Sequence, residues 1–304
     1  MVTIDDVSKT YKKATSPAID RVSLSISQGE LFGLVGPDGA GKTTLFRILT
    51  TLLLPDGGSA QVDRFDIVKD FKEIRKHVGY MPGRFSLYQD LTVAENLNFF
   101  AALFGTTVEK NYDLIKDIYI QIEPFKHRRA GQLSGGMKQK LALSCALIHK
   151  PRVLFLDEPT TGVDPISRKE FWEMLKRLKK QGITIIVSTP YMDEATLCDR
   201  IALIQGGKIL AVNTPSTIIN QYQEPLYAMR STEIPRLLMD LRKYENTLSC
   251  FTFGEYLHLS FRENYPGATD DLKKYAEALH HKEVEVKPVR PTIEDCFIRL
   301  LKEN

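Results

Sequence analysis

The stretch GELFGLVGPDGAGKTTLFRILTTLL, residues 29–53, decides the fold of this chain. Residues 29–36 form a short apolar run that ends in glycine, which is typical of a buried strand entering a loop. From residue 41 onward the apolar residues recur at the spacing of one helix face. Strand, glycine-rich loop and helix in this order predict a backbone that wraps around phosphate groups.

The loop itself, residues 36–43, fits the pattern G-x-x-x-x-G-K-[ST] in full. Its N–H groups and the N-terminus of the following helix are expected to form an anion cradle. Lys42 is expected to reach the β- and γ-phosphates of ATP, and the Thr43 hydroxyl to coordinate Mg²⁺. The alternative is a glycine turn with a solvated lysine. The residues predicted to contact the nucleotide are Gly36, Pro37, Asp38, Gly39, Ala40, Gly41, Lys42, Thr43 and Thr44.

A second apolar run, residues 152–156, is followed directly by Asp157 and Glu158. Beside a phosphate loop, Asp157 would hold the magnesium ion through water, and Glu158 would orient or deprotonate the attacking water. Without such a loop, two carboxylates after a strand are more often a helix cap. A GTPase is disfavoured because no N/T-K-x-D motif follows a later strand.

The rest of the chain predicts an α/β domain followed by a smaller one. An amphipathic stretch at 165–180 precedes a third buried run at 183–188, and this alternation predicts a largely parallel sheet. Residues 86–150 are rich in helical patterns and are interpreted as an insert between strands. The pattern of apolar and polar residues changes near residue 220, so residues 221–304 are expected to form a small second α/β domain.

Composition excludes several classes of protein. A hydrophobic content of 43% with 26% charged residues describes a globular chain, and a net charge of +3 over 304 residues gives no reason to expect nucleic acid as a partner. The longest apolar runs are far shorter than the ~20 residues of a spanning helix, and the N-terminus has no signal-peptide core. Any membrane contact is therefore expected to run through a partner. The four cysteines are isolated, which favours buried reduced thiols.

A second glycine-rich motif, LSGGM at residues 133–137, begins a helical stretch and places its serine 23 residues before Asp157. Together with LFLDEPTTGVDP at residues 154–165, it closely resembles the ATP-binding cassette (ABC) family over residues 1–220. The resemblance implies a P-loop NTPase core of the ABC type. Such a core has a mainly parallel sheet, an antiparallel β part and a helical subdomain, here at about residues 86–150.

The resemblance also implies how two chains share their sites. Tyr11 matches the aromatic residue that stacks on adenine, although an edge-strand tyrosine is the alternative. Ser134, Gly135 and Gly136 match the signature loop, which closes over the γ-phosphate held by the other subunit. Asp164 matches a loop that crosses the interface. The implied unit is a head-to-tail dimer with two ATP molecules between its subunits.

The tail PTIEDCF, residues 291–297, resembles the terminal segment of drug-exporter ATPases. This resemblance implies a separate integral-membrane permease and a peripheral position on the cytoplasmic face of the cell membrane. A soluble ABC ATPase acting on ribosomes or DNA is the alternative, disfavoured because the chain has one cassette and no coiled-coil insert. Residues 221–304 could bind a small effector or support a dimer, and the sequence favours the second role.

Two positions depart from the family pattern. Gly83 stands where the family has a glutamine that senses the γ-phosphate and the permease, and Pro190 stands where it has a histidine that bonds to the γ-phosphate. Neither residue can replace these hydrogen bonds. We therefore expect slow hydrolysis at the chain's own ATP site, with its signature loop completing a faster site on a different subunit. A homodimer would carry the same weakened chemistry twice.

Overall fold

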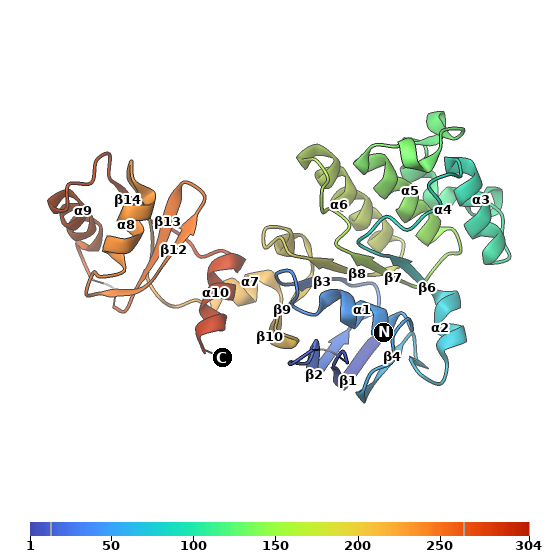
Figure 1. The fold of residues 1–304 in the computed structure, drawn as a ribbon, viewed down its shortest axis with the longest axis horizontal. Helices are drawn as coiled ribbons and strands as arrows, with labels where there is room; N and C mark the ends of the chain where they lie inside the picture. Colours follow the sequence, from blue (N-terminus) through green and yellow to red (C-terminus); the bar gives the residue numbers. More distant parts are fainter. Residues whose placement is uncertain (13, 264, 304) are drawn as a thin grey trace. The chain divides into compact units, whose positions relative to one another are not determined.

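The computed structural model describes residues 1–12, 14–263 and 265–303 of the chain (Figure 1). The chain divides into two compact units, the first spanning Met1–Pro215 and the second beginning at Ser216. Each unit has a sheet and a hydrophobic core of its own. The two are described separately below.

The centre of the first unit is a six-stranded sheet with the order β10-β9-β3-β8-β7-β6. All neighbouring strands are parallel except the antiparallel pair β9 and β10. Every residue of β3, β7 and β8 is buried, as expected for strands covered on both faces. The strands are β3 (Leu31–Val35), β6 (Val78–Met81), β7 (Val153–Asp157), β8 (Thr184–Thr189), β9 (Arg200–Gln205) and β10 (Lys208–Asn213).

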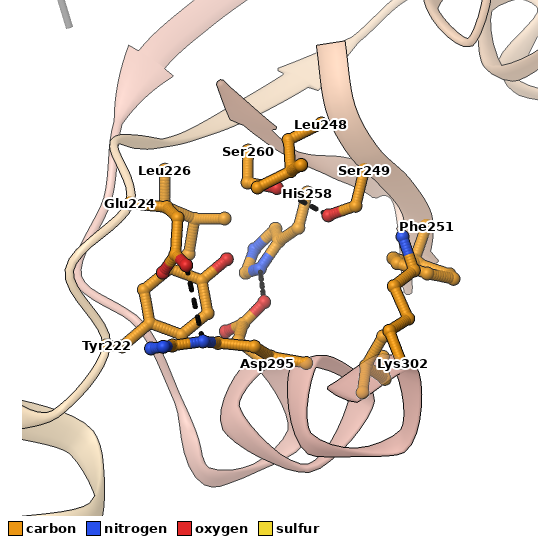
Figure 2. A pocket seen from close by; sticks show the side chains of 12 residues that line it. Tyr222, Glu224, Leu226, Leu248, Ser249, Phe251, His258, Ser260, Asp295 and Lys302 are labelled. Carbon is orange, nitrogen blue, oxygen red and sulfur yellow. Dashed lines mark hydrogen bonds and ion pairs between the residues drawn. The ribbon is translucent and has the colours of Figure 1, made fainter. Parts of the chain in front are cut away.

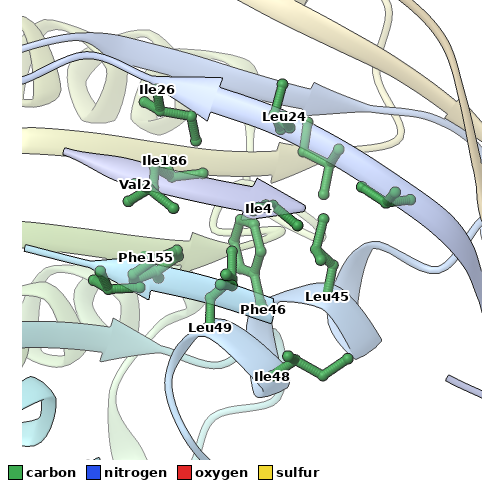
Figure 3. Packing of buried hydrophobic residues seen from close by; sticks show 14 of the residues in the cluster. Val2, Ile4, Leu24, Ile26, Leu45, Phe46, Ile48, Leu49, Phe155 and Ile186 are labelled. Atoms are coloured by element: carbon green, nitrogen blue, oxygen red, sulfur yellow. The ribbon is translucent and has the colours of Figure 1, made fainter. Parts of the chain in front are cut away.

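A second, antiparallel sheet in this unit has the order β2-β1-β4-β5. Its strands are β1 (Val2–Lys9), β2 (Ile19–Ile26), β4 (Gly57–Val62) and β5 (Phe65–Asp66). Helix α1 (Lys42–Leu49) packs between the two sheets, as Figure 3 shows for Phe46, which lies among Val2, Ile4 and Phe155. The Phe46 and Phe155 rings meet edge to face with centroids 5.4 Å apart. Burial of these apolar side chains fixes the helix that follows the glycine-rich loop.

The remaining helices of this unit are α2 (Phe71–His77), α3 (Val93–Leu103), α4 (Tyr112–Tyr119), α5 (Gly135–Leu147) and α6 (Pro165–Lys180). Figure 1 shows α3 to α6 on one side of the parallel sheet and α1 with the antiparallel sheet on the other. Helix α3 begins with a capping box, in which Thr92 and Glu95 each satisfy the other's backbone N–H. Short 3₁₀ turns occur at Glu109–Asn111, Glu123–Phe125, Ala130–Gln132 and Glu194–Leu197.

The second unit is a four-stranded antiparallel sheet with the order β12-β13-β11-β14. Its elements are α7 (Pro215–Asn220), β11 (Leu226–Arg230), α8 (Ile234–Leu241), β12 (Thr247–Phe253), β13 (Tyr256–Phe261), α9 (Ala268–Ala278), β14 (Glu285–Pro288) and α10 (Ile293–Glu303). From β11 to β14 this is the split β-α-β-β-α-β arrangement of ferredoxin-like domains. Residues of α8 and α9 form the core with one face of the sheet.

Three further observations concern thiols, metal-binding side chains and membrane-spanning helices. The four cysteines are free and buried, which confirms the expected buried thiols. Burial raises the pKa of the Cys296 thiol to about 11, so this group stays protonated at neutral pH. Among the described residues, no helix is both long and apolar enough to span a bilayer, and no cluster of three metal-binding side chains occurs.

Candidate functional site

The glycine-rich loop joins β3 to α1 and leaves no room for larger residues at two of its positions. A Cβ atom at Gly36 would lie 2.1 Å from the Ile204 carbonyl oxygen, and one at Gly41 would lie 2.4 Å from that of Ala18. Gly41 is also the N-cap of α1 and has a φ of 107°, which L side chains rarely adopt. The fold of the loop therefore requires glycine at both positions.

The first turn of α1 offers donors that the chain itself does not use. Gly41 has no side chain to cap the helix. Within the described part of the chain, no protein acceptor is bonded to the amide N–H groups of Lys42, Thr43 and Thr44. Unbonded amides at a helix N-terminus attract an anion such as a phosphate group. The geometry thus fits the phosphate cradle predicted from the sequence.

Lys42 lies inside this cradle. Its side chain is only 3% exposed, and the ammonium donates to the carbonyl oxygens of Gly36 at 2.7 Å and Pro37 at 2.9 Å. The same nitrogen lies 3.1 Å from Glu158 Oε1. A buried cation held by neutral carbonyls and one carboxylate is placed to meet further negative charge.

The acidic pair lies at the end of β7 and is fixed by the neighbouring strand β8. The Ser188 hydroxyl donates to Asp157 Oδ1 at 2.6 Å, and the Glu158 amide donates to the Ser188 carbonyl oxygen at 3.1 Å. Glu158 has a φ of 50°, a sparsely populated conformation for a residue with a side chain. The structure therefore brings Glu158 to Lys42 and holds Asp157 directly behind it.

The donors near Asp157 fit a magnesium ion that takes most of its ligands from a nucleotide and water. Asp157 is buried, and the residue type at position 43 supplies a hydroxyl at the start of α1. Mg²⁺ is usually bound by one or two carboxylates together with substrate phosphates rather than by an all-protein cage.

One departure from the family pattern adjoins the acidic pair, and the other follows the strand that bonds to this pair. A Cβ atom at Gly83 would lie 3.0 Å from the Asp157 carbonyl oxygen and 3.8 Å from the Glu158 Cβ. Pro190 follows the last residue of β8, two positions after Ser188. A side chain at position 83 would thus begin beside the acidic pair, where the sequence predicts the reacting phosphate. A side chain at position 190 would begin at the end of the strand that carries Ser188, the partner of Asp157.

A buried glutamate that the sequence analysis missed has partners on three other segments near this site. Glu194 is 1% exposed and accepts hydrogen bonds from the Thr189 hydroxyl and, at 2.7 Å, from the Thr160 hydroxyl. Arg168 of α6 lies 3.6 Å from the same carboxylate. The ion pair and hydrogen bonds join the end of β8 to the loop after β7. No local pattern marks such a residue, because two of its partners, Thr160 and Arg168, are distant in sequence.

Tyr11 lies beside the start of α1. Its hydroxyl is 3.2 Å from Thr44 Oγ1, and the residue is 41% exposed. An exposed aromatic ring next to a phosphate cradle offers a face for a base to stack on. The position is consistent with the expected adenine contact.

The signature loop lies at the start of α5, against the N-terminal end of α6. Ser134 is the N-cap of α5 and accepts from the Met137 amide at 3.4 Å. A Cβ atom at Gly136 would lie 3.0 Å from Ser167 Oγ, and one at Gly135 would lie 3.6 Å from the Gly162 carbonyl oxygen. Asp164, the N-cap of α6, accepts from the Ile166 and Ser167 amides. These contacts, taken over the described residues, do not involve the phosphate loop of the same chain.

Comparisons with known proteins show which family this chain is similar to. Residues 19–161 match the family model described as ABC transporter. The probable multidrug ABC transporter ATP-binding protein YbhF of Escherichia coli is 39% identical over 99% of this chain, which spans 52% of that relative's length. The Nod factor export ATP-binding protein I of Rhizobium etli is 38% identical, over 73% of this chain and 71% of the relative.

Solved structures give the same answer for the fold. A dimeric ATP-binding cassette, MJ0796, in a post-hydrolysis state with ADP and phosphate, superposes with a TM-score of 0.64 at 27% identity. The superposition covers 70% of this chain and 98% of that cassette. The predicted α/β class with a P-loop core is therefore confirmed.

Proposed function

We propose an export role for this chain, which belongs to the family of ABC transporter ATP-binding proteins. In this proposal it is the ATP-binding and ATP-hydrolysing subunit of a complex whose membrane permease is a separate polypeptide. The printed names of its relatives, a probable multidrug transporter subunit and a Nod factor export protein, support the direction of transport. The observation that carries the proposal is the buried Lys42 ammonium beside unbonded helix amides and the Glu158 carboxylate.

The phosphates of ATP are assigned to the loop at residues 36–44. Lys42 neutralises the β- and γ-phosphates, and the loop amides donate to their oxygens. Thr43 and Asp157, the latter through water, would hold Mg²⁺, which would supply positive charge beside the phosphate groups. Glu158 orients the attacking water and takes up its proton, since its carboxylate lies 3.1 Å from the Lys42 ammonium that is proposed to hold the phosphates.

Adenine is assigned to the face of Tyr11, whose exposed ring lies next to Thr44. Stacking on an aromatic ring tolerates any base and is worth about 1–3 kcal/mol. The hydroxyl contact with Thr44 supports the proposal because it fixes the ring close to the phosphate loop.

A second ATP-binding subunit completes the site in this proposal. The signature loop presents Ser134, Gly135 and Gly136 at the N-terminus of α5, where backbone amides and the helix dipole favour an anion. Its contacts with Gly162 and Ser167 leave the phosphate loop of the same chain untouched. The γ-phosphate bound by this loop would therefore belong to the partner, in the arrangement of a head-to-tail dimer.

Hydrolysis at the chain's own phosphate loop is proposed to be slow. Pro190 has no donor and Gly83 has no side chain; Gly83 adjoins the acidic pair, and Pro190 follows the strand that carries Ser188. Loss of one transition-state donor costs about 3–4 kcal/mol, or roughly 10²–10³ in rate. Binding should be little affected, because Lys42, Asp157 and Glu158 are retained. A heterodimer with a more active partner site follows from this asymmetry.

The permease contact is assigned to an apolar groove beside Gly83. The groove has a volume of about 660 Å³ and is lined by Met81 and Pro82 with Leu103 and Phe104 of α3 and its C-terminal end. Leu103 is 64% exposed, so a large apolar side chain faces solvent there. A helical segment of the permease, on the cytoplasmic face of the membrane, would cover this surface and communicate with the ATP site.

The experiment that tests the proposal compares ATPase activity with and without a second subunit. The purified chain should bind MgATP but hydrolyse it slowly, and activity should rise when the second ATP-binding subunit of its complex is added. The rise should disappear when Ser134 of this chain is replaced by arginine. Rapid hydrolysis by the isolated chain would contradict the asymmetric part of the proposal, and loss of MgATP binding would contradict all of it.

A further inference from the structure

The second unit contains a cavity of about 270 Å³ between its sheet and α10 (Figure 2). Strands β12 and β13 contribute Phe251, His258 and Ser260 to the cavity wall, and the segment before β11 contributes Tyr222 and Glu224. Successive strand residues face opposite sides, and Leu257 and Leu259 pack in the core with α8 and α9. The cavity therefore lies on the other face of the sheet, away from the hydrophobic core.

Helix α10 presents one face to this cavity. Asp295, Ile298, Arg299 and Lys302 all line it. Their spacings of three, four and seven positions place them on a single stripe of the helix. One helix face thus brings an acidic group, an apolar group and two cations to the same small space.

The two carboxylates at the cavity already have partners. Asp295 Oδ1 bonds to His258 Nδ1 at 2.8 Å, and its Oδ2 accepts from the Thr292 amide at 2.8 Å and hydroxyl at 2.7 Å. Glu224 lies 3.2 Å from the Arg299 guanidinium. Neither carboxylate is placed to bind a further cation, because both Asp295 oxygens already have hydrogen-bond partners and Arg299 offsets the charge of Glu224.

Lys302 is the cation at the cavity whose charge is not offset in this way. Over the described residues, no carboxylate lies within ion-pair distance of its ammonium. The ammonium instead lies 4.9 Å from the centroid of the Phe251 ring, a cation–π contact. A carboxylate in the cavity could pair with this ammonium, while an aromatic body would meet the Phe251 ring.

A row of hydroxyl groups adds a donor. The Ser249 and Ser260 hydroxyls bond to each other, and the Tyr222 phenol lines the same cavity. Burial is the main reason that the pKa of Tyr222 is raised to about 12, so the phenol keeps its proton. The two serine hydroxyls share one hydrogen bond, which leaves one of their protons available for an acceptor.

We propose that this cavity binds a small aromatic carboxylate of one or two rings. Its carboxylate would pair with Lys302 and accept from the hydroxyl row, and its ring would lie on the apolar surface formed by Phe251, Leu226 and Ile298. The volume of about 270 Å³ lies near the lower limit of known small-molecule sites, which sets the ring number. The site is distinct from the nucleotide site, because every residue that lines it belongs to the second unit.

The test uses 2-naphthoate and its neutral analogue 2-naphthylmethanol as probes on the full-length chain. Isothermal titration should give saturable binding of 2-naphthoate, about fivefold or more tighter than 2-naphthylmethanol, as expected for one partly exposed ion pair. Lys302→Gln should abolish this difference, whereas the exposed control Lys274→Gln should preserve it. Saturating MgATP should leave both affinities unchanged.

A second variant tests the position of the ring. Ser249→Met places a longer side chain at the cavity wall and should weaken both probes about tenfold or more, with a thermal midpoint within about 2 °C of the parent. The proposal is overturned by absence of saturable binding or by equal affinity for the two probes. It is also overturned by competition from MgATP, or by two variants that bind like the parent.

Discussion

The Lys42 ammonium and Glu158 Oε1 lie 3.1 Å apart, with Lys42 only 3% exposed. The cation proposed to hold the phosphates and the carboxylate proposed to activate water thus converge at one point, where α1 begins and β7 ends. Ser188 fixes that point by bonding to both members of the acidic pair. This pairing brings the groups proposed for nucleotide binding and for hydrolysis together from two different segments of the chain.

Glu158→Gln separates these two roles. The amide keeps the shape of the side chain but cannot accept a proton, so ATPase activity should fall about 100-fold or more while MgATP affinity stays within about threefold. Steady-state phosphate release and equilibrium binding measure the two quantities. Glu255→Gln, at a carboxylate that is 86% exposed in the second unit, is the matched control and should change neither. Equal activity of Glu158→Gln and the parent would contradict the assigned role.

Pro190→His restores a donor at the end of β8. The imidazole would begin two residues beyond Ser188, the partner of Asp157, so hydrolysis should rise about tenfold or more at saturating ATP. Gly83→Gln should help less, because its Cβ would meet the Asp157 carbonyl oxygen at 3.0 Å and force a small shift. Single-turnover kinetics of both variants provide the measurement. An unchanged rate in Pro190→His would show that the missing donor does not limit turnover.

Tyr11→Ala tests the adenine contact. Loss of one stacking face should weaken ATP binding about tenfold, since stacking is worth about 1–3 kcal/mol. Tyr11→Phe keeps the ring and loses only the 3.2 Å contact with Thr44, so its affinity should stay within about threefold of the parent. Fluorescence titration with a labelled ATP analogue distinguishes the two variants. If alanine and phenylalanine have the same effect, the ring is not the adenine platform.

The buried His149 ring leads us to expect that the free energy of unfolding falls in acid. Burial lowers its pKa to about 4 from the model-compound value of 6.5, and the ring stacks on Phe104 at 3.8 Å. The unfolded chain therefore binds this proton more readily, so the stability contributed by neutral His149 declines as pH falls from about 6.5 toward 4. Between pH 7.5 and 5.5, His149→Gln should lose about 1 kcal/mol less free energy of unfolding than the parent, measured by urea denaturation. The exposed control His127→Gln should behave like the parent, and so would His149→Gln if this mechanism were absent.

Local sequence patterns predicted the elements whose signal lies within one segment. The amphipathic stretch at residues 165–180 coincides with α6, and the three apolar runs became β3, β7 and β8 within two residues of their expected ends. These strands are parallel neighbours, as the alternation of strands and helices implied. Buried strands and capped helices are predictable because their residues report directly on burial and capping.

Contacts between distant segments were not predictable in this way. Helix α9 ends at Ala278, and beyond it His281 bonds to Asp240 of α8 at 3.0 Å, 41 positions earlier in the sequence. Glu194 likewise bonds to Thr160, which is 34 positions away and meets it only after the sheet has formed. The phosphate-loop residues could be predicted because they form one contiguous sequence motif. The assignment of Tyr11 depended on family resemblance, and it stays a prediction.

The most direct test of the account is MgATP binding by the parent chain and by Lys42→Ala. Lys42 supplies the buried ammonium at the centre of the phosphate cradle, so its removal should weaken MgATP binding by about 100-fold or more, measured by isothermal titration calorimetry. Lys274→Ala, at an exposed position in the second unit, should bind like the parent. If Lys42→Ala folds and binds MgATP as tightly as the parent, the phosphate loop is not the nucleotide site and the account is wrong.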